Sequence, residues 1–249
     1  MNTAVVKPVS GKYFGYAYTD FKADVFFNAA LRYAQRLSNK RTPPEQLHIV
    51  IFGGAFGYEA ARFAKQGHRV TMFDIGDYSD SVRDINQALG RDLVTFVEAD
   101  IRKIKFQDYP KADLIFCSNL LHFMNAPDAI LALVAISGFL KPKARCFLRF
   151  NGSRQITPAP FLDLQERVAA AALTTKIKGA LVNVQQYPYS FAEIQILLAQ
   201  ANLRISKYNS YLVPHRIIAS IAAGKEIKPT RELAALYPCA SNKSNLTHA

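Results

Sequence analysis

The chain has 249 residues, of which 50% are hydrophobic and 20% are charged, so an extensively disordered protein is excluded. Lysine and arginine number 31 against 19 aspartate and glutamate residues, which gives a formal net charge of +12. The basic residues form no long run, and residues 151–249 owe their charge density to a scarcity of acids. This distribution disfavours a polybasic nucleic-acid tail and leaves a general attraction for anionic ligands.

The cysteines and the apolar stretches of the chain indicate the cellular compartment in which the protein is expected. The cysteines Cys117, Cys146 and Cys239 are odd in number and widely spaced, so neither a disulfide framework nor a metal site is expected. The N-terminus lacks the apolar core of a signal peptide, and the longest apolar stretch, residues 129–140, is too short for a membrane span. We therefore expect a protein of the reducing cytoplasm with no membrane partner.

The first half of the chain indicates a parallel sheet. Residues 1–46 are expected to form an N-terminal helical cap, with a helix over residues 21–37 that ends before Pro43 and Pro44. Short apolar runs then alternate with helical patterns. Strands are predicted over residues 47–52, 69–74, 93–97, 112–118 and 144–150, and helices over 57–65, 79–89 and 127–140. This alternation predicts βαβ units with right-handed crossovers, which place helices on both faces of a parallel sheet.

The pattern changes after residue 151. Residues 152–188 are predicted to form a substrate-side insertion, with an alanine-rich helix over residues 162–173 followed by a polar loop. Ser190 and Glu193 have the spacing of a capping box, which begins a helix over residues 189–201. Two further strands are predicted over residues 203–208 and 216–222, and residues 223–249 form a C-terminal tail. The main domain is therefore expected to span residues 47–222.

A glycine-rich turn joins the first strand to the helix after it. It contains Gly53, Gly54 and Gly57, and glycine lets the backbone turn sharply and approach a ligand closely. The helix that follows presents free N–H groups and a positive dipole end to an anion. Asp74 ends the second strand, where a carboxylate accepts hydrogen bonds from ribose hydroxyls. The combination indicates an adenosine-containing ligand, although Asp74 as a helix N-cap is an alternative.

The spacing of this turn distinguishes between ligand families. The segment from Gly53 to Gly57 does not fit the dinucleotide fingerprint GxGxxG, but it fits GxGxG with Ala55 in the place of the middle glycine. It resembles motif I of the class I S-adenosylmethionine (SAM)-dependent methyltransferases. Other segments resemble this family in the same order over about residues 45–222, namely residues 73–75, 98–101, 113–123, 140–144 and 189–203.

The resemblance implies a fold, a cofactor and a set of binding residues. The implied fold is an α/β, doubly wound, mostly parallel seven-stranded sheet with helices on both faces and the last strand antiparallel. The implied cofactor is S-adenosyl-L-methionine. Asp74 would bind the ribose and Asp100 the adenine edge, with a turn cap as the alternative role of Asp100. The candidate cofactor-binding residues are Gly53, Gly54, Ala55, Gly57, Asp74, Ile75, Asp100, Ile101 and Asn119.

The chain departs from the family pattern at three places. Ile51 stands where the family usually has an acid that helps to orient the amino end of the methionine group. Ala55 adds a methyl group in motif I, and Lys143 with Ala144 replaces the glycine pair of the later turn. These departures motivate a methyltransferase fold that no longer catalyses and acts as a binding module.

The predicted activity is transfer of a methyl group to a small-molecule acceptor by in-line displacement (EC 2.1.1.-). Such a reaction depends mainly on positioning, so a base is needed only where the acceptor loses a proton. The candidate catalytic residues are His122 and Tyr18. His122 is the candidate general base, with simple packing as the alternative, and Tyr18 would belong to an aromatic lid over the site or, alternatively, to the core.

Several properties bear on the acceptor. The insertion carries Arg154, Lys176 and Lys178 with few acids, which favours an anionic or polar small molecule. The loop after the fourth strand lacks the NPPY-type tetrapeptide of many nucleic-acid amino-methyltransferases. An RNA methyltransferase or RNA-binding protein that uses the net charge of +12 stays an alternative, whereas the glycine spacing argues against a nicotinamide dehydrogenase. The oligomeric state is not specified by the sequence.

Overall fold

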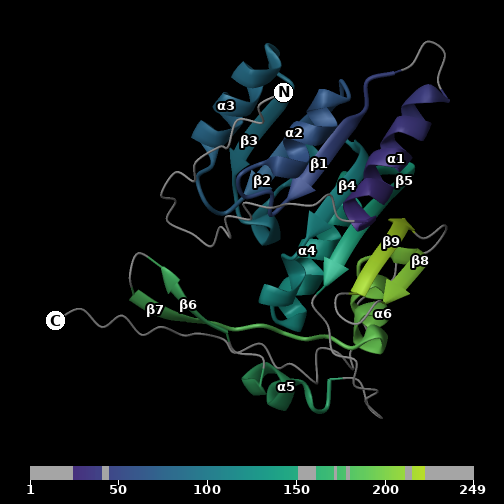
Figure 1. Cartoon of the computed structure of the whole chain (residues 1–249). Coiled ribbons are helices and arrows are strands. Elements are labelled where there is room, and N and C mark those ends of the chain that lie inside the picture. The colour runs from purple at the N-terminus through teal and green to yellow at the C-terminus, as the bar shows by residue number, and fades with distance from the viewer. Residues whose placement is uncertain are drawn as a thin grey trace.

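The computed structural model describes residues 25–40, 45–150, 161–170, 173–177, 180–210 and 215–221. Its framework is a seven-stranded sheet with the strand order β3-β2-β1-β4-β5-β9-β8 (Figure 1). The strands are β1 (His48–Phe52), β2 (Arg69–Asp74), β3 (Val94–Glu98), β4 (Ala112–Ser118), β5 (Leu140–Phe150), β8 (Leu203–Ser210) and β9 (His215–Ile221). Strands β1 to β5 are mutually parallel, and β9 runs antiparallel to both β5 and β8. The predicted mostly parallel sheet with an antiparallel last strand is confirmed.

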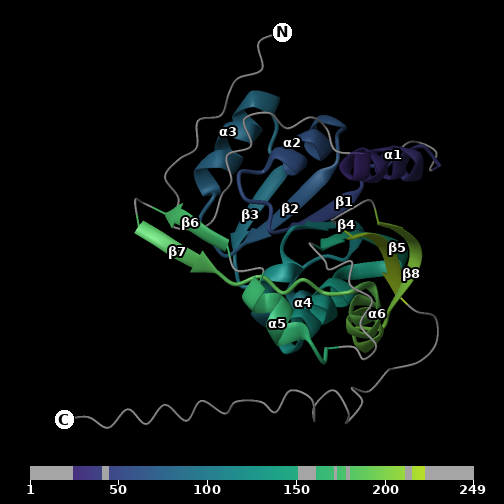
Figure 2. The same cartoon turned by 60° about the horizontal axis from the view of Figure 1, so that its bottom comes forward.

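Helices cover both faces of this sheet (Figure 2). The helices are α1 (Val25–Asn39), α2 (Tyr58–Lys65), α3 (Ser79–Leu89), α4 (Ala126–Phe139), α5 (Leu164–Ala170) and α6 (Phe191–Gln200). Two short 3₁₀ helices, η1 (Ile101–Lys103) and η2 (Phe106–Asp108), lie between β3 and β4, and a third, η3 (Leu121–Phe123), lies between β4 and α4. None of the helices in the described ranges is long and apolar enough to cross a membrane.

The central strands are apolar because both of their faces are buried. In β1, Ile49 and Ile51 pack into the core beneath α1, α2 and α3, whereas Val50 and Phe52 pack into the core beneath α4 and α6. This division explains the continuous apolar run of β1, since a strand buried on one face only would alternate with polar residues. The two cores together make the sheet a rigid support for the loops at its ends.

Helix α1 is part of the core that packs on the sheet. The ring of Phe27 lies 5.3 Å from that of Phe63 in α2 and 5.3 Å from that of Phe116 in β4, both in edge-on geometry. Edge-on pairs of buried aromatic rings are favourable beyond the apolar area that they bury. The helix therefore belongs to the same core as α2, and the boundary of a separate N-terminal cap at residue 46 stays a prediction.

The insertion differs from its predicted form. Where a polar loop was expected, the described residues contain a two-stranded antiparallel hairpin, with β6 (Leu173–Ile177) and β7 (Ala180–Val184). The sequence LTTKI, rich in β-branched residues, was the signal for a strand. Helix α5 and this hairpin lie beyond the ends toward which the parallel strands point (Figure 1).

A buried ion pair ties the insertion to the helix that follows it. Arg167 in α5 is 7% exposed, and its Nη2 lies 2.5 Å from Oε1 of the fully buried Glu193. The other oxygen of Glu193 accepts the backbone N–H of Ser190 at 2.7 Å, so the predicted capping box is confirmed. One carboxylate thus caps α6 and holds α5 in place.

Candidate active site at the carboxyl ends of the strands

The strand order indicates the end of the sheet at which a ligand is expected to bind. The chain passes from β1 to β2 and β3 on one side, and then to β4 and β5 on the other side of β1. Ligands of open α/β sheets bind outside the carboxyl ends of the strands at such a reversal. The loops after β1 and β4 therefore frame the candidate site.

Short contacts join the loops that follow these strands. The backbone N–H of Ala99 donates to the carbonyl oxygen of Asp74 at 2.8 Å, which joins the ends of β3 and β2. The N–H of Ala55 donates to Oδ2 of Asp74 at 3.0 Å, which joins the ends of β2 and β1. A Cβ atom placed on Gly53 would lie 3.3 Å from Cβ of Leu120, so the loops after β1 and β4 also touch. The predicted cofactor residues are thereby gathered at one end of the sheet.

Packing and backbone geometry explain why glycine occupies two positions of the turn. A Cβ atom on Gly54 would lie 2.4 Å from Cγ of Met72, so only glycine lets the turn approach β2 this closely. Gly57 is the N-cap of α2 with a φ of +75°, and it has no side chain with which to cap that helix. In the first turn the carboxylate of Glu59 accepts its own backbone N–H. The segment therefore joins a tight turn to a helix N-terminus.

Two residues adopt the backbone conformation of the glycines that they replace. Ala55 has a φ of +43° and Lys143 a φ of +66°, both in the left-handed region. This conformation costs a non-glycine residue about 1–2 kcal/mol. The glycine-type backbone of motif I thus persists in spite of the substitution at Ala55. Asn119, after β4, is also left-handed with a φ of +58°.

Asp74 is a half-buried carboxylate at the centre of these loops. Its Oδ1 accepts the N–H of Gly76 at 3.0 Å, and its Oδ2 accepts that of Ala55. Burial raises the pKa of Asp74, and these backbone hydrogen bonds oppose the rise. The backbone N–H of Ile75 also bonds this carboxylate, so about one of its four acceptor sites is left for a further donor. Beside Asp74, the side chain of Ile75 is 50% exposed, which offers an apolar surface next to the carboxylate.

Asp100 is positioned by an arginine that the sequence reading missed. It is the N-cap of η1 and accepts the backbone N–H of Arg102 at 3.0 Å, as its alternative role as a turn cap requires. The guanidinium of Arg102 also binds this carboxylate, and that hydrogen bonding lowers the pKa of Asp100. The adjacent side chain of Ile101 is 5% exposed and lies in the core, so only its backbone is left for a ligand.

Of the two predicted catalytic residues, the structure describes His122 but not Tyr18. His122 lies in η3 and is 1% exposed, and burial lowers its pKa to about 4, so the imidazole is neutral near pH 7. Its carbonyl oxygen accepts the N–H of Tyr187 at 2.7 Å, while the hydroxyl of Tyr189 donates to the carbonyl of Met124. This burial favours the packing role, and a general-base role for His122 stays a prediction. Tyr18 lies outside the described residues.

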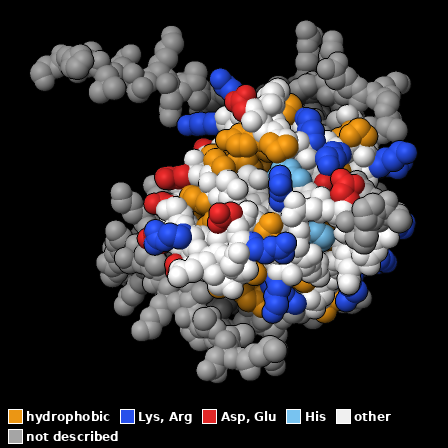
Figure 3. Space-filling view, turned by 90° about the horizontal axis from the view of Figure 1, so that it is seen from above, with side chains coloured by type: hydrophobic (Ala, Val, Ile, Leu, Met, Phe, Trp, Pro, Cys, Tyr) orange, Lys and Arg blue, Asp and Glu red, His pale blue; other side chains and the backbone are white. Residues whose placement is uncertain are grey.

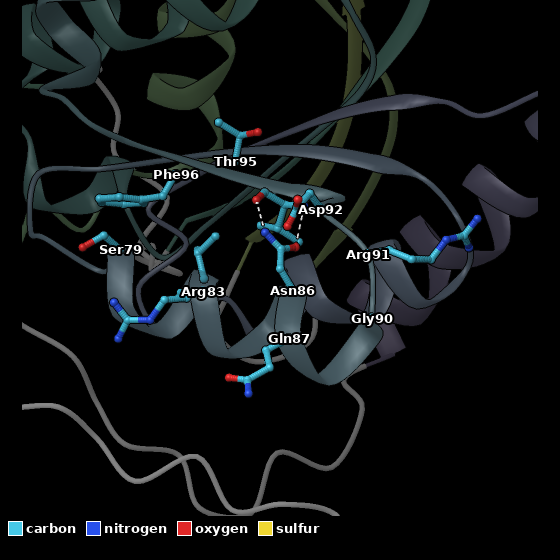
Figure 4. Close-up of a pocket in the computed structure, with 11 residues that line it drawn as sticks. Ser79, Arg83, Asn86, Gln87, Gly90, Arg91, Asp92, Thr95 and Phe96 are labelled. Carbon is cyan, nitrogen blue, oxygen red and sulfur yellow. Dashed lines mark hydrogen bonds between the residues drawn. The ribbon is translucent and has the colours of Figure 1, made fainter.

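A hollow lies away from these strand ends. It is an open depression of about 740 Å³ between α3 and the edge strand β3 (Figure 4). The amide of Asn86 occupies its centre, where Nδ2 donates to the carbonyl of Val94 at 2.8 Å and Oδ1 accepts the N–H of Val94 at 3.0 Å. Asn86 therefore holds α3 against β3, and none of the predicted site residues lines this depression.

Within the described ranges no cluster of His, Cys, Asp or Glu is arranged to hold a metal ion.

Comparisons with known proteins agree with this architecture. Residues 51–148 match the family described as a methyltransferase domain. A search of curated proteins finds no match. One similar solved structure is 1,6-didemethyltoxoflavin-N1-methyltransferase from Burkholderia thailandensis, with bound 1,6-didemethyltoxoflavin and S-adenosylhomocysteine. It has a TM-score of 0.54 and 19% identity, over 78% of this chain and 79% of that chain.

Two further structures have the same fold. An S-adenosylmethionine-dependent methyltransferase from Clostridium acetobutylicum has a TM-score of 0.58 at 10% identity, over 81% of this chain and 94% of that chain. Magnesium protoporphyrin IX methyltransferase from Synechocystis, with bound SAM, has a TM-score of 0.55 at 14% identity, over 79% and 78% of the two chains. The chain therefore has the Rossmann-like methyltransferase fold, and its residues 51–148 match the model of a methyltransferase domain.

Proposed function

We propose that this protein is a SAM-dependent methyltransferase that transfers a methyl group to a small-molecule acceptor by in-line displacement. The observation that carries the proposal is the Asp74 carboxylate, which lies against the glycine turn at the reversal of strand order. This pairing lies within the residues that match the methyltransferase domain family. The same carboxylate would accept a hydrogen bond from the ribose of the cofactor on its remaining acceptor site.

The described residues fit the other parts of the cofactor. Ile75 would pack against the adenine, and Asp100 with the backbone of Ile101 would face its polar edge. The first turn of α2 begins at a glycine N-cap, which has no side chain to cap it and so leaves room for the carboxylate of the methionine group. The turn of Gly53, Gly54, Ala55 and Gly57 would bind the methionine end, and Asn119 would lie near the transferred methyl group.

The chemistry requires orientation more than proton transfer. When bound, SAM supplies a methyl group that is activated by its positively charged sulfur. The protein then holds the acceptor in line with that methyl group, and such positioning lowers a barrier by about 7–11 kcal/mol. A neutral, buried His122 is compatible with a reaction in which SAM supplies the activation and the protein supplies the positioning. The acceptor loses a proton to a base only if it is an alcohol or an ammonium group.

A small-molecule acceptor is supported by the segments beyond the strand ends. Helix α5 and the β6–β7 hairpin lie on that side of the sheet (Figure 1). The side chains of Phe123 and Leu162, on the loop after β4 and in the insertion, are 37% and 78% exposed, which suits an acceptor with an apolar face. The similar Burkholderia and Synechocystis enzymes are named for small heterocyclic substrates. An anionic acceptor stays a prediction.

Two other functions are alternatives that the calorimetric experiment below distinguishes from the proposal. A binding module without catalysis is favoured by Ile51, which is 2% exposed and apolar where the family has an acid. An RNA-binding role would need a continuous basic surface. On the one face that Figure 3 shows, basic side chains are interspersed with acidic ones. We place the small-molecule methyltransferase first, because similar structures are named for small-molecule substrates.

Calorimetry of the full chain with S-adenosylhomocysteine and, separately, NADH tests the proposal. We expect S-adenosylhomocysteine to bind and NADH not to bind, with an affinity loss of at least about ten-fold in Asp74→Asn. Asp77→Asn is the matched control, because Asp77 is an exposed carboxylate nearby that caps the turn before α3. Absence of S-adenosylhomocysteine binding refutes the proposal. Binding without any metabolite that gains a methyl group from labelled SAM identifies the binding module instead.

A further inference from the structure

Four neighbouring elements carry basic residues and no acidic residue. They are α1 and the last three strands in the order of the sheet, β5, β9 and β8 (Figure 1, Figure 2). Lysine and arginine residues number two in α1, four in β5, one in β9 and two in β8, and these elements contain no aspartate or glutamate. At the opposite end of the sheet, α3 and β3 contain Asp80, Asp84 and Glu98. The charges of the described residues are therefore segregated by element.

Three exposed cations lie close together across the strands. The register of β5 against β9 places Arg145 beside Ser220, and Ser220 is opposite Arg204 in β8. Lys207 is opposite Ile218, which is two residues before Ser220 and packs against the core on the α1 side of the sheet. Residues two apart in a strand, and residues paired across strands, point to the same face. Arg145, Arg204 and Lys207 therefore share the face of the sheet on which α1 lies.

Helix α1 adds two further cations next to these three. The guanidinium carbon of Arg145 lies 5.2 Å from the ring centre of Tyr33 in α1. Burial raises the pKa of Tyr33, and the charges of Arg145 and Arg36 oppose that rise, so both cations lie close to the tyrosine. Arg32 is exposed one helical turn before Arg36. We call the set of Arg32, Arg36, Arg145, Arg204 and Lys207 the basic face.

The charges of the basic face are not neutralised by acidic neighbours. None of the ion pairs among the described residues includes any of its five cations. The nearby Asp113 is buried and is paired with Lys141 at 2.9 Å. Arg145 and Arg204 also lie near the beginnings of β5 and β8, whereas the candidate cofactor residues follow the carboxyl ends of their strands. The basic face is therefore separate from the candidate cofactor site.

The composition of this surface indicates the class of its partner. Of the exposed large hydrophobic side chains in the described ranges, only that of Val25 belongs to α1, β5, β8 or β9. Protein interfaces have an apolar core, and membrane-surface helices insert apolar side chains, neither of which this surface offers. The phosphates of a nucleic acid require only cations. Four of the five cations are arginines, which bind phosphate oxygens in bidentate geometry.

We propose that the basic face is a docking surface for a nucleic acid, which it binds through the phosphodiester backbone without regard to base sequence. The inference goes beyond the proposed function, because it adds a second binding surface away from the cofactor site. Contacts to phosphates position a nucleic acid and carry no sequence information. Five such contacts predict that the logarithm of the binding constant falls with the logarithm of the salt concentration, with a slope of about −3 to −4 for a single strand.

Fluorescence anisotropy of the full chain with labelled oligouridine and oligothymidine, over about 50–200 mM salt, tests the proposal. We expect the two strands to bind with similar affinity, with a dissociation constant of about 1–100 µM at physiological salt. In the triple variant Arg145→Gln, Arg204→Gln, Lys207→Gln we expect at least about ten-fold weaker binding and a slope that is smaller by about 2, because three phosphate contacts are lost. Addition of S-adenosylhomocysteine should leave these affinities unchanged.

Matched variants separate a local surface from the overall charge. The triple variant Arg83→Gln, Arg91→Gln, Lys105→Gln removes the same number of charges at exposed positions outside the basic face. It should change the affinity by less than about two-fold, because salt screens distant charges. Thermal unfolding reports whether each variant folds, and Arg145→Lys with Arg204→Lys keeps the charges and should keep the salt slope.

Equal losses of affinity in the two triple variants overturn the inference, because the binding then follows overall charge and not the basic face. Failure of both oligonucleotides to bind overturns it as well. Binding of vesicles that contain phosphatidylserine, without binding of either oligonucleotide, would assign the basic face to a membrane instead.

Discussion

The backbone N–H of Ala55 donates to Oδ2 of Asp74 at 3.0 Å, and this one hydrogen bond connects the turn after β1 to the end of β2. It depends on a left-handed backbone at Ala55, whose φ is +43°. The residue in the place of a family glycine thus orients the carboxylate that we assign to the ribose. The turn after β1 therefore keeps its contact with the end of β2 although its sequence departs from the usual pattern.

Restoring the glycine should relieve the strain at this position. We expect Ala55→Gly to raise the free energy of unfolding by up to about 1 kcal/mol, because the relief of about 1–2 kcal/mol exceeds the entropic cost of glycine. Urea unfolding measures the change. Ala61→Gly, in the interior of α2, is the control and should lower stability by about 1 kcal/mol. If both substitutions destabilise equally, the left-handed strain at Ala55 is absent.

Adding a methyl group to Gly54 should disturb the packing of β2. The new Cβ atom would lie 2.4 Å from Cγ and 2.5 Å from Sδ of Met72, so the methionine side chain has to move. We expect Gly54→Ala to cost about 1–3 kcal/mol in unfolding free energy. Combining it with Met72→Ala should show a favourable coupling in a double-mutant cycle, since the smaller side chain makes room. Simple additivity would contradict the predicted clash.

The buried pair of Arg167 and Glu193 should be needed to hold the insertion. Arg167→Met leaves the carboxylate of Glu193 with only its two backbone donors, Ser190 and Phe161. An uncompensated buried charge costs about 3–5 kcal/mol. We expect faster proteolysis within α5, measured by mass spectrometry of the fragments, and lower stability. Arg83→Met removes an exposed ion pair and should change stability by less than about 0.5 kcal/mol. Equal effects of the two variants would refute the role of the buried pair.

Acid should destabilise the protein through His122. Its pKa is about 4 in the folded protein and about 6.5 when unfolded, so the unfolded state binds more protons between these values. Above pH 6.5 His122 is neutral in both states, and the free energy of unfolding is not reduced. As the pH decreases from 6.5 to 4, the free energy of unfolding falls by up to about 3 kcal/mol. Urea unfolding at several pH values measures this slope. His122→Asn should flatten it, and an unchanged slope would show that His122 does not contribute.

Much of the framework follows from local patterns in the sequence. Continuous apolar runs such as residues 48–52 indicate strands buried on both faces, and their alternation with helices leaves a parallel sheet as the natural arrangement. The glycine turn and Asp74 follow their strands directly, so the end of the sheet on which they meet is determined by strand direction alone. The capping box of α6 is likewise a local pattern and was predicted correctly.

Other features depend on contacts between distant segments. Asp100 and Arg102 are neighbours in sequence, but the pairing of Arg102 with Asp128 exists only because η1 packs against the start of α4. The burial of His122 arises when the segment around Tyr187 and Tyr189 bonds to the loop after β4, and no local pattern contains that contact. The sequence by itself therefore determined the sheet and the position of its glycine turn, because hydrophobic periodicity and glycine act locally. Only the tertiary structure decided which charges are paired and which titratable groups are removed from water, because these depend on residues that are far apart in the chain.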